Sequence, residues 1–222
     1  MHTSSKLQSD VVREVRLTPA GLDGLLGVPP AAKGIVAFAH GSGSGRLSPR
    51  NNLVATALRE AGLATLLFDL LTAKEASRRE NVFDIELLAG RLVAATAWLG
   101  EQPETQRLPV GYFGASTGAA AALVAATRAT TSIGAIVARG GRPDLAETAL
   151  PDVTAPTLLI VGGNDPLVLD LNRAALAELR CEKRLEIVPL AGHLFEEPGT
   201  LDAVIELARG WFVAHLGKET RA

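Results

Sequence analysis

The segment Gly114-Ala-Ser116-Thr-Gly118 places a serine between two glycines in the pattern G-x-S-x-G, which occurs once in the chain. It directly follows the apolar run LPVGYF and opens the alanine-rich run TGAAAALVAAT. A turn this tight between a strand and a helix needs glycine on both sides of the serine, because larger side chains would collide with neighbouring backbone. The helix N-terminus behind the serine favours negative charge. Ser116 is therefore a candidate nucleophile, and the alternative is a core serine on an ordinary turn.

A serine hydroxyl attacks efficiently only when a base accepts its proton and a third group orients that base. His193 follows the last expected strand, and Asp165 follows the strand before it, within Gly-Gly-Asn-Asp-Pro. Both loops leave the carboxyl edge of a parallel sheet, where ligands bind in such sheets. We therefore expect a catalytic triad of Ser116, Asp165 and His193. The alternatives are a surface histidine and an aspartate that serves only a turn or a helix cap.

Arginine recurs in the loops that we expect at this same sheet edge. Three pairs follow three of the expected strands: Arg46 and Arg50, Arg78 and Arg79, and Arg139 and Arg142. The planar guanidinium binds carboxylate or phosphate, so a negatively charged substrate is one hypothesis. Arg139 is the substrate-binding candidate, because it follows its strand immediately. The alternative is a set of solvated surface charges, some of them paired with Glu75, Glu80 or Asp144.

The apolar runs that must position these residues alternate between strand and helix patterns from residue 34 to the end. The expected strands are 34–39, 64–69, 108–113, 133–138, 156–161 and 184–189. The expected helices are 51–61, 117–127, 167–179 and 201–216, together with one that Asn81 caps and that runs to residue 99. Such alternation predicts an α/β fold with a mainly parallel sheet and helices on both faces. Two earlier runs, 11–17 and 22–28, predict an N-terminal antiparallel hairpin. We interpret residues 10–217 as a single domain.

Composition narrows the function classes further. The chain has 222 residues, 22 Lys and Arg against 24 Asp and Glu, and a formal charge of −2, which argues against a nucleic-acid binder. The single cysteine excludes an intrachain disulfide and fits a reducing, cytoplasmic setting. The uncharged stretch 108–127 is interrupted by Pro109 and several glycines, so we do not interpret it as a membrane span. The histidines and the cysteine lack metal-site spacing. We expect a small-molecule substrate and no cofactor, metal, nucleic-acid or membrane partner.

Four motifs carry a resemblance to a known family: HGSGSG at 40–45, GASTG at 114–118, GGNDP at 162–166 and GHLFEEP at 192–198. With them, residues 11–216 resemble an α/β-hydrolase, most closely the dienelactone-hydrolase-like branch, in which the triad follows the order Ser, Asp, His. The resemblance implies a serine hydrolase that cleaves an ester, lactone or thioester through an acyl-enzyme. Dienelactone hydrolases proper carry cysteine in the elbow, so Ser116 favours a general serine esterase.

The same resemblance implies an oxyanion hole made by the backbone N–H groups of Ser42 and Thr117. In this interpretation His40 anchors its loop by hydrogen bonds and is not a catalyst. Only residues 139–155 lie between two expected strands after the elbow, which leaves no room for a large lid. We also expect Glu196 and Glu197 to cap the final helix, and the alternative is that they shape the site.

Three alternatives use the same residues differently. GSGSG after a strand, with Asp69 further on, resembles a dinucleotide-binding unit, but Arg46 stands where that pattern requires glycine. A non-catalytic binding module with this fold would not need Ser116, Asp165 and His193 together. An acyltransferase or thioesterase would use the same triad with a different acceptor or acyl group, and the residues do not separate it from an esterase.

Overall fold

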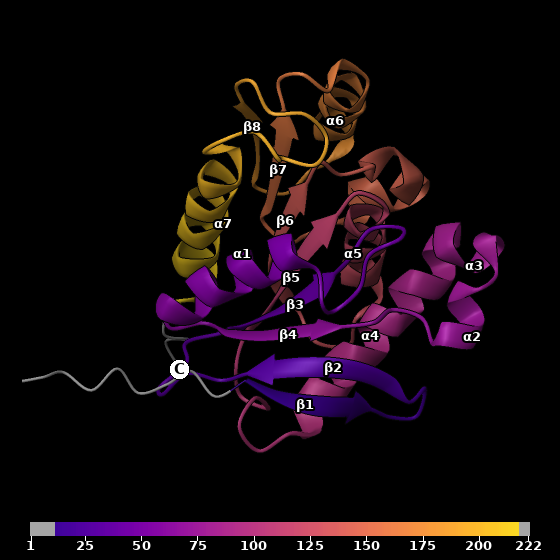
Figure 1. Ribbon diagram of the computed structural model, residues 1–222, viewed down its shortest axis with the longest axis vertical. Helices are drawn as coiled ribbons and strands as arrows, with labels where there is room; N and C mark the ends of the chain where they lie inside the picture. Colours follow the sequence, from indigo (N-terminus) through magenta and orange to yellow (C-terminus); the bar gives the residue numbers. More distant parts are fainter. Residues whose placement is uncertain (1–11, 218–222) are drawn as a thin grey trace, which may run out of the picture.

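The computed structural model of the protein describes residues 12–217, so residues 10 and 11 of the expected domain lie outside the described part. Its centre is an eight-stranded sheet in the order β1-β2-β4-β3-β5-β6-β7-β8 (Figure 1). β1 pairs with β2, and β2 with β4, in antiparallel fashion, and the other pairings are parallel. The strands are β1 Val12–Leu17, β2 Leu22–Gly27, β3 Ile35–Ala39, β4 Ala64–Phe68, β5 Val110–Ala115, β6 Ile133–Arg139, β7 Thr157–Gly162 and β8 Lys183–Val188. The predicted parallel sheet with an N-terminal antiparallel hairpin is confirmed.

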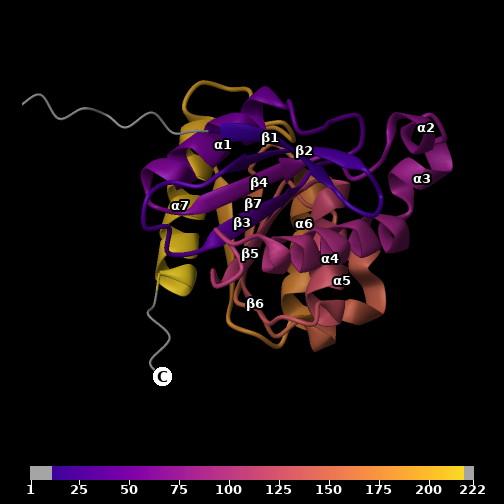
Figure 2. The same ribbon diagram turned by 90° about the horizontal axis from the view of Figure 1, so that it is seen from below.

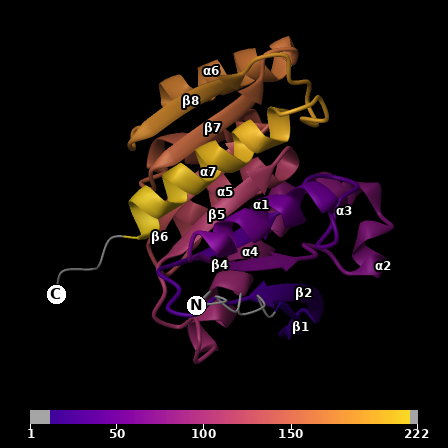
Figure 3. The same ribbon diagram turned by 60° about the vertical axis from the view of Figure 1, so that its left-hand side comes forward.

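Helices cover both faces of this sheet, as Figures 2 and 3 show. On one face α1 (Pro49–Glu60) and α7 (Thr200–Leu216) pack together over a core that includes Phe113 and Phe212. On the other face α4 (Ile85–Glu101) and α5 (Thr117–Arg128) pack over a core that includes Tyr112, with α6 (Pro166–Glu178) further along. Five of the six alanines of α5 are fully buried, because their small side chains let the helix lie close to the sheet.

The central and the edge strands differ as their sequences require. β3 (IVAFA), β4 (ATLLF) and β5 (VGYFGA) are buried at every position, which is the pattern of strands covered on both faces. The edge strands β1 (VREVRL) and β8 (KRLEIV) carry exposed charged residues, which discourage pairing with another sheet. The carboxyl ends of the central strands thus rise from a rigid, fully packed layer.

The connection from β4 to α4 is more structured than a charged loop. It contains the short helices α2 (Ala73–Ala76) and α3 (Arg79–Phe83), which stand off the main body in Figure 1. Thr72 caps α2 through a reciprocal capping box with Glu75. The expectation that Asn81 caps α4 is wrong: Asn81 lies inside α3, and the Asp84 carboxylate accepts the Leu87 N–H at the start of α4.

Between β6 and β7 the chain forms only the short 3₁₀ segment η1 (Pro143–Asp152), which packs against α5 and α6. The expected absence of a large lid therefore holds for residues 12–217. Within that range, no helix is both long enough and apolar enough to cross a membrane.

Candidate active site

Ser116 sits at the turn between β5 and α5 in a backbone conformation that few non-glycine residues adopt, with φ 51° and ψ −121°. A Cβ at Gly114 would lie 2.5 Å from the Cα of Ala119, and a Cβ at Gly118 would lie 2.1 Å from the carbonyl oxygen of Ala39. Only glycine fits at either position. The turn is therefore the strand–turn–helix elbow that the sequence predicts, and it exposes the Ser116 hydroxyl above the sheet edge.

The three residues of the expected triad lie side by side. The Nδ1 atom of His193 is 2.7 Å from Oδ2 of Asp165, and its Nε2 atom is 3.4 Å from Oγ of Ser116. The Asp165 carboxylate favours the tautomer with a proton on Nδ1, which leaves Nε2 as the acceptor that faces the serine. A contact of 3.4 Å is long for a hydrogen bond, as is common before a substrate draws the catalytic groups together. The arrangement can remove a proton from a serine hydroxyl.

Two loops hold His193 in place. At Gly162 a Cβ would lie 2.3 Å from the Ala191 carbonyl oxygen, so glycine lets the loop after β7 touch the loop after β8. The Glu197 carboxylate accepts the Gly192 N–H at 3.0 Å, and this hydrogen bond holds the pKa of Glu197 below its ordinary value. The expectation that the two glutamates cap α7 is wrong. Gly199 is the N-cap and no side chain caps the helix, while Glu196 pairs with Arg50 at 2.7 Å.

The two expected oxyanion donors also meet at the elbow. Gly41 packs against the nucleophile, since a Cβ there would lie 3.0 Å from Cβ of Ser116. The Ser42 N–H donates to Oγ1 of Thr117 at 3.1 Å. Thr117 is the first residue of α5, so its own N–H has no acceptor within the helix. A carbonyl oxygen could therefore use the Thr117 N–H directly and would compete with the Thr117 hydroxyl for the Ser42 N–H.

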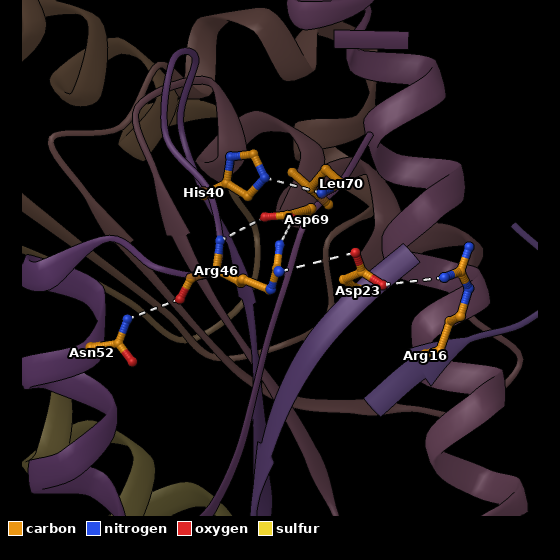
Figure 4. Close-up of polar contacts among 7 residues, drawn as sticks. All are labelled: Arg16, Asp23, His40, Arg46, Asn52, Asp69 and Leu70. Carbon is orange, nitrogen blue, oxygen red and sulfur yellow. Dashed lines mark hydrogen bonds and ion pairs between the residues drawn. The ribbon is translucent and has the colours of Figure 1, made fainter. Parts of the chain in front are cut away.

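His40 ties the loop after β3 to the end of β4, as expected of an anchor (Figure 4). Its Nδ1 lies 3.0 Å from the Gly41 carbonyl oxygen, and its Nε2 accepts the Leu70 N–H at 3.0 Å. The ring is therefore neutral, with its proton on Nδ1. Burial lowers the pKa of His40 from its ordinary value of 6.5, which strengthens that assignment.

Arg46 and Asp69 form an ion pair that closes the same loop (Figure 4). The Asp69 carboxylate also accepts the Arg46 backbone N–H at 2.8 Å. The next charges in line are Asp23, 4.0 Å from the Arg46 guanidinium, and Arg16, 3.8 Å from Asp23. Asp69 is thus engaged within the chain, in contrast to the free acidic residue that a dinucleotide-binding unit offers to a ribose.

Arg139, at the end of β6, is the exception among the arginines near the cleft. Its side chain is 8% exposed, and its Nε and Nη1 atoms are buried without a hydrogen-bond partner. The guanidinium lies 5.9 Å from the ring centroid of Phe195. Burial, followed by the positive charge of Arg50, lowers the pKa of Arg139 to about 10. By contrast, Arg142 pairs with Asp144 at 2.7 Å.

These residues surround one open cleft of about 680 Å³, lined by Ser116, His193, Arg139, Arg50, Arg46 and the loop 41–45. The volume lies in the range of small-molecule sites. Within residues 12–217, no cluster of three or more His, Cys, Asp and Glu side chains is placed to hold a metal ion. Sequence reasoning considered a role of Glu197 in shaping the site only as the alternative to helix capping, and it did not predict the contact with the histidine loop.

Comparison with known proteins shows the family of this chain. The model of the dienelactone hydrolase family matches residues 22–206. The chain belongs to the dienelactone hydrolase family. A dienelactone hydrolase structure from Anabaena variabilis is 56% identical, with a TM-score of 0.88 over 93% of this chain and 97% of that one. Est1E from Butyrivibrio proteoclasticus has a TM-score of 0.77 over 93% and 99% of the two chains, but at 15% identity it shows the fold alone.

A Mycobacterium tuberculosis protein that bears the name of a phosphoribosyl transferase is 60% identical over 198 residues. These residues cover 89% of this chain but 45% of that relative, so the chain spans less than half of its length. Membership in the dienelactone hydrolase family, together with the fold, supports hydrolase activity for this chain.

Proposed function

We propose that the chain is a serine hydrolase that cleaves a carboxylic ester, lactone or thioester of a small substrate through an acyl-enzyme. The observation that carries the proposal is the linked series of side chains Asp165, His193 and Ser116, of which His193 and Ser116 line an open cleft. A serine with a base at its hydroxyl and a carboxylate behind the base is the minimum apparatus of nucleophilic acyl transfer.

In the first half of the reaction, Nε2 of His193 takes the hydroxyl proton of Ser116 while Oγ bonds to the carbonyl carbon of the substrate. The carbonyl electron pair moves onto oxygen, where the N–H groups of Thr117 and Ser42 stabilise the negative charge. The pair then returns, the bond to the leaving group breaks, and His193 protonates the departing oxygen or sulfur. Water repeats the sequence on the acyl-enzyme and releases the acid and the free Ser116 hydroxyl.

We further propose that Arg139 binds a negatively charged group of the substrate. A buried guanidinium without a counter-ion is costly, and a carboxylate or phosphate in the cleft would supply the missing acceptors. Arg50 lies close enough to influence Arg139, but its own charge is paired with Glu196. His193 must protonate the leaving group, and Arg139 lines the same cleft as His193. The anionic group therefore belongs to the alcohol or thiol part of the substrate.

Labelling with a fluorophosphonate tests the nucleophile directly, because the probe forms a covalent bond only with an activated serine. We expect one labelled peptide, containing Ser116, and rapid turnover of at least one compound in a panel of esters, thioesters and lactones. Ser116→Ala should lose both signals while its circular dichroism spectrum stays that of the parent. Labelling of a different serine in the parent protein would contradict the proposal.

An acyltransferase would share every step up to the acyl-enzyme and differ only in the acceptor. Adding an alcohol or a thiol to the reaction and analysing the products separates the two activities. Hydrolysis is supported if free acid dominates at all acceptor concentrations, and acyl transfer if the new ester or thioester does.

A further inference from the structure

A second cavity, of about 520 Å³, lies beside the triad cleft. Its walls are the turn between β1 and β2, the loop 41–44, the end of β4 with the start of α2, and side chains of α3 and α4. The segment containing α2 and α3 stands off the main body at this side of the molecule (Figure 1). The mechanism described above places no group in this cavity.

The cavity and the cleft share one wall, formed by the loop 41–44 with Arg46 and Asp69. Thr117 lines the cavity, whereas Ser116 and His193 line the cleft. A carbonyl group bound between Ser116 and the N–H groups of Ser42 and Thr117 therefore lies at the junction of the two spaces. One of its two substituents can extend into each.

The proton path decides which substituent goes where. His193 must hand its proton to the leaving group, so the leaving group lies on the side of His193, in the cleft. The acyl chain departs from the carbonyl carbon in the other direction, toward Thr117 and the cavity.

The lining of the cavity is suited to an uncharged group. Leu22, Leu71 and Leu88 contribute apolar side chains that are largely buried, and Val82 is half-buried. The charged residues at the wall alternate in sign along the series in Figure 4, from Arg16 through Asp23 and Arg46 to Asp69. With two positive and two negative charges paired in this way, the wall has no charge left for an ionic ligand.

We propose that this cavity is the subsite for an apolar, uncharged acyl chain of the substrate. The proposal rests on the proposed serine hydrolase activity and makes it more specific. The favoured substrate then has two unlike ends, an apolar acyl chain in the cavity and an anionic alcohol or thiol in the cleft.

Ala76 at the end of α2 offers a direct test, because its exposed side chain lines the cavity and can be enlarged with little risk to the fold. Ser77, also exposed and outside the lining, provides the matched control. The substrates are the 4-nitrophenyl esters of acetate, butyrate and octanoate. For Ala76→Trp we expect kcat/KM for the octanoate ester to fall about tenfold and kcat/KM for the acetate ester to change less than about twofold. The larger side chain displaces methylene groups of the long acyl chain only, and each buried methylene contributes a similar increment of binding. Ser77→Trp should leave the whole series unchanged, and Val82→Trp should repeat the pattern of Ala76→Trp.

Equal changes across the acyl series in both cavity variants would overturn the proposal. A selective loss in a series of acetate esters of lengthening alcohols would overturn the side assigned to the acyl chain. Binding of 2-nonanone, a ketone that cannot be hydrolysed, is followed by NMR line broadening and does not depend on turnover. We expect binding to the parent protein and to Ser77→Trp, with weaker binding to Ala76→Trp, and no binding to the parent would contradict the subsite. Failure of the hydrolase proposal shows itself separately, as absent fluorophosphonate labelling of Ser116.

Discussion

The triad cleft and the neighbouring cavity share a wall, but they differ in whether the arginines that line them are paired with acidic residues. On the cavity side, Arg16 and Arg46 each face an aspartate, so the charges cancel within the chain. On the cleft side, Arg139 is buried with two nitrogen atoms unpartnered. A buried charge is stable only when something compensates it. The difference supports the two proposals made above, in which the cavity takes an uncharged group and the cleft takes a negatively charged one.

The largest expected effect is common to both regions and comes from the reacting centre between them. His193→Ala should lower kcat/KM about 10⁴-fold or more for every substrate, whether anionic or neutral, because the base is lost. Asp165→Asn should cost about 10⁴-fold, because the amide favours the wrong tautomer of His193. Steady-state kinetics with a neutral and an anionic ester provide the measurement. If Asp165→Ala retained most of the parent rate, the acid would have to be another residue.

The next effect should separate the two regions. Arg139→Met keeps an apolar side chain of similar length and removes the charge. The two test substrates are 4-(butyryloxy)benzoate, whose leaving group carries a carboxylate, and its neutral analogue methyl 4-(butyryloxy)benzoate. We expect kcat/KM to fall about 10–100-fold for the charged substrate and much less for the neutral one, since hydrogen bonds to charged groups are worth about 1.5–3 kcal/mol. Arg142→Met is the control, because that guanidinium pairs with Asp144. Equal losses on the two esters would refute a role of Arg139 in binding the anion.

A smaller effect should appear when an arginine at the cavity wall loses its counter-ion, as Arg139 lacks one in the cleft. Asp69→Asn removes the charge that neutralises Arg46 while keeping an acceptor for the Arg46 N–H. We then expect hydrolysis of esters with a terminal carboxylate on the acyl chain to improve a few-fold relative to the uncharged chain of equal length. The comparison of the two kcat/KM values, in parent and variant, is the measurement. An unchanged ratio would mean that the pairing on the wall does not set the charge preference of the cavity.

The smallest effect concerns stability and pH. The folded protein binds a proton at His40 less readily than the unfolded chain, because burial lowers the pKa of His40 below 6.5. The unfolded state therefore binds more protons as the pH falls below that value, and the free energy of unfolding decreases. In His40→Gln this decrease should be smaller between neutral pH and about pH 5. Urea denaturation at both pH values gives the decrease in the free energy of unfolding for the parent and for the variant. An equal decrease in the two proteins would show that another group is responsible.

Much of the site could be predicted from order along the chain. Ser116, Asp165 and His193 each follow a strand of one parallel sheet, and parallel strands bring their carboxyl ends to a common edge. The structure places the three side chains in contact, and their catalytic roles stay a prediction. The pairing of Arg142 with Asp144, one of the alternatives open from the sequence, is confirmed. The pairing of Arg46 with Asp69 could not be predicted, because the two residues are 23 positions apart and meet only when β3 and β4 pack side by side. No spacing rule distinguishes that arginine from Arg139.

The errors of prediction have local causes. Asn81 and Asp84 are both good N-cap residues and lie three positions apart. Because Asn81 lies inside the short helix α3, Asp84 is the residue that caps α4. Glu197 could have capped α7, but its carboxylate accepts the Gly192 N–H instead, and Gly199, with a positive φ, is the N-cap. In each case two local solutions were open, and tertiary contacts selected one.

The elbow conformation of Ser116 also has a consequence for heat resistance. A residue with a Cβ held at φ 51° and ψ −121° costs the fold about 1–3 kcal/mol, whatever its side chain does. Alanine at position 116 would keep that cost, whereas Ser116→Gly would remove it and should raise the melting temperature, since the added entropy of the unfolded chain offsets only about 0.4–1 kcal/mol. At this one position, the variant that withstands heat best is one that can no longer react.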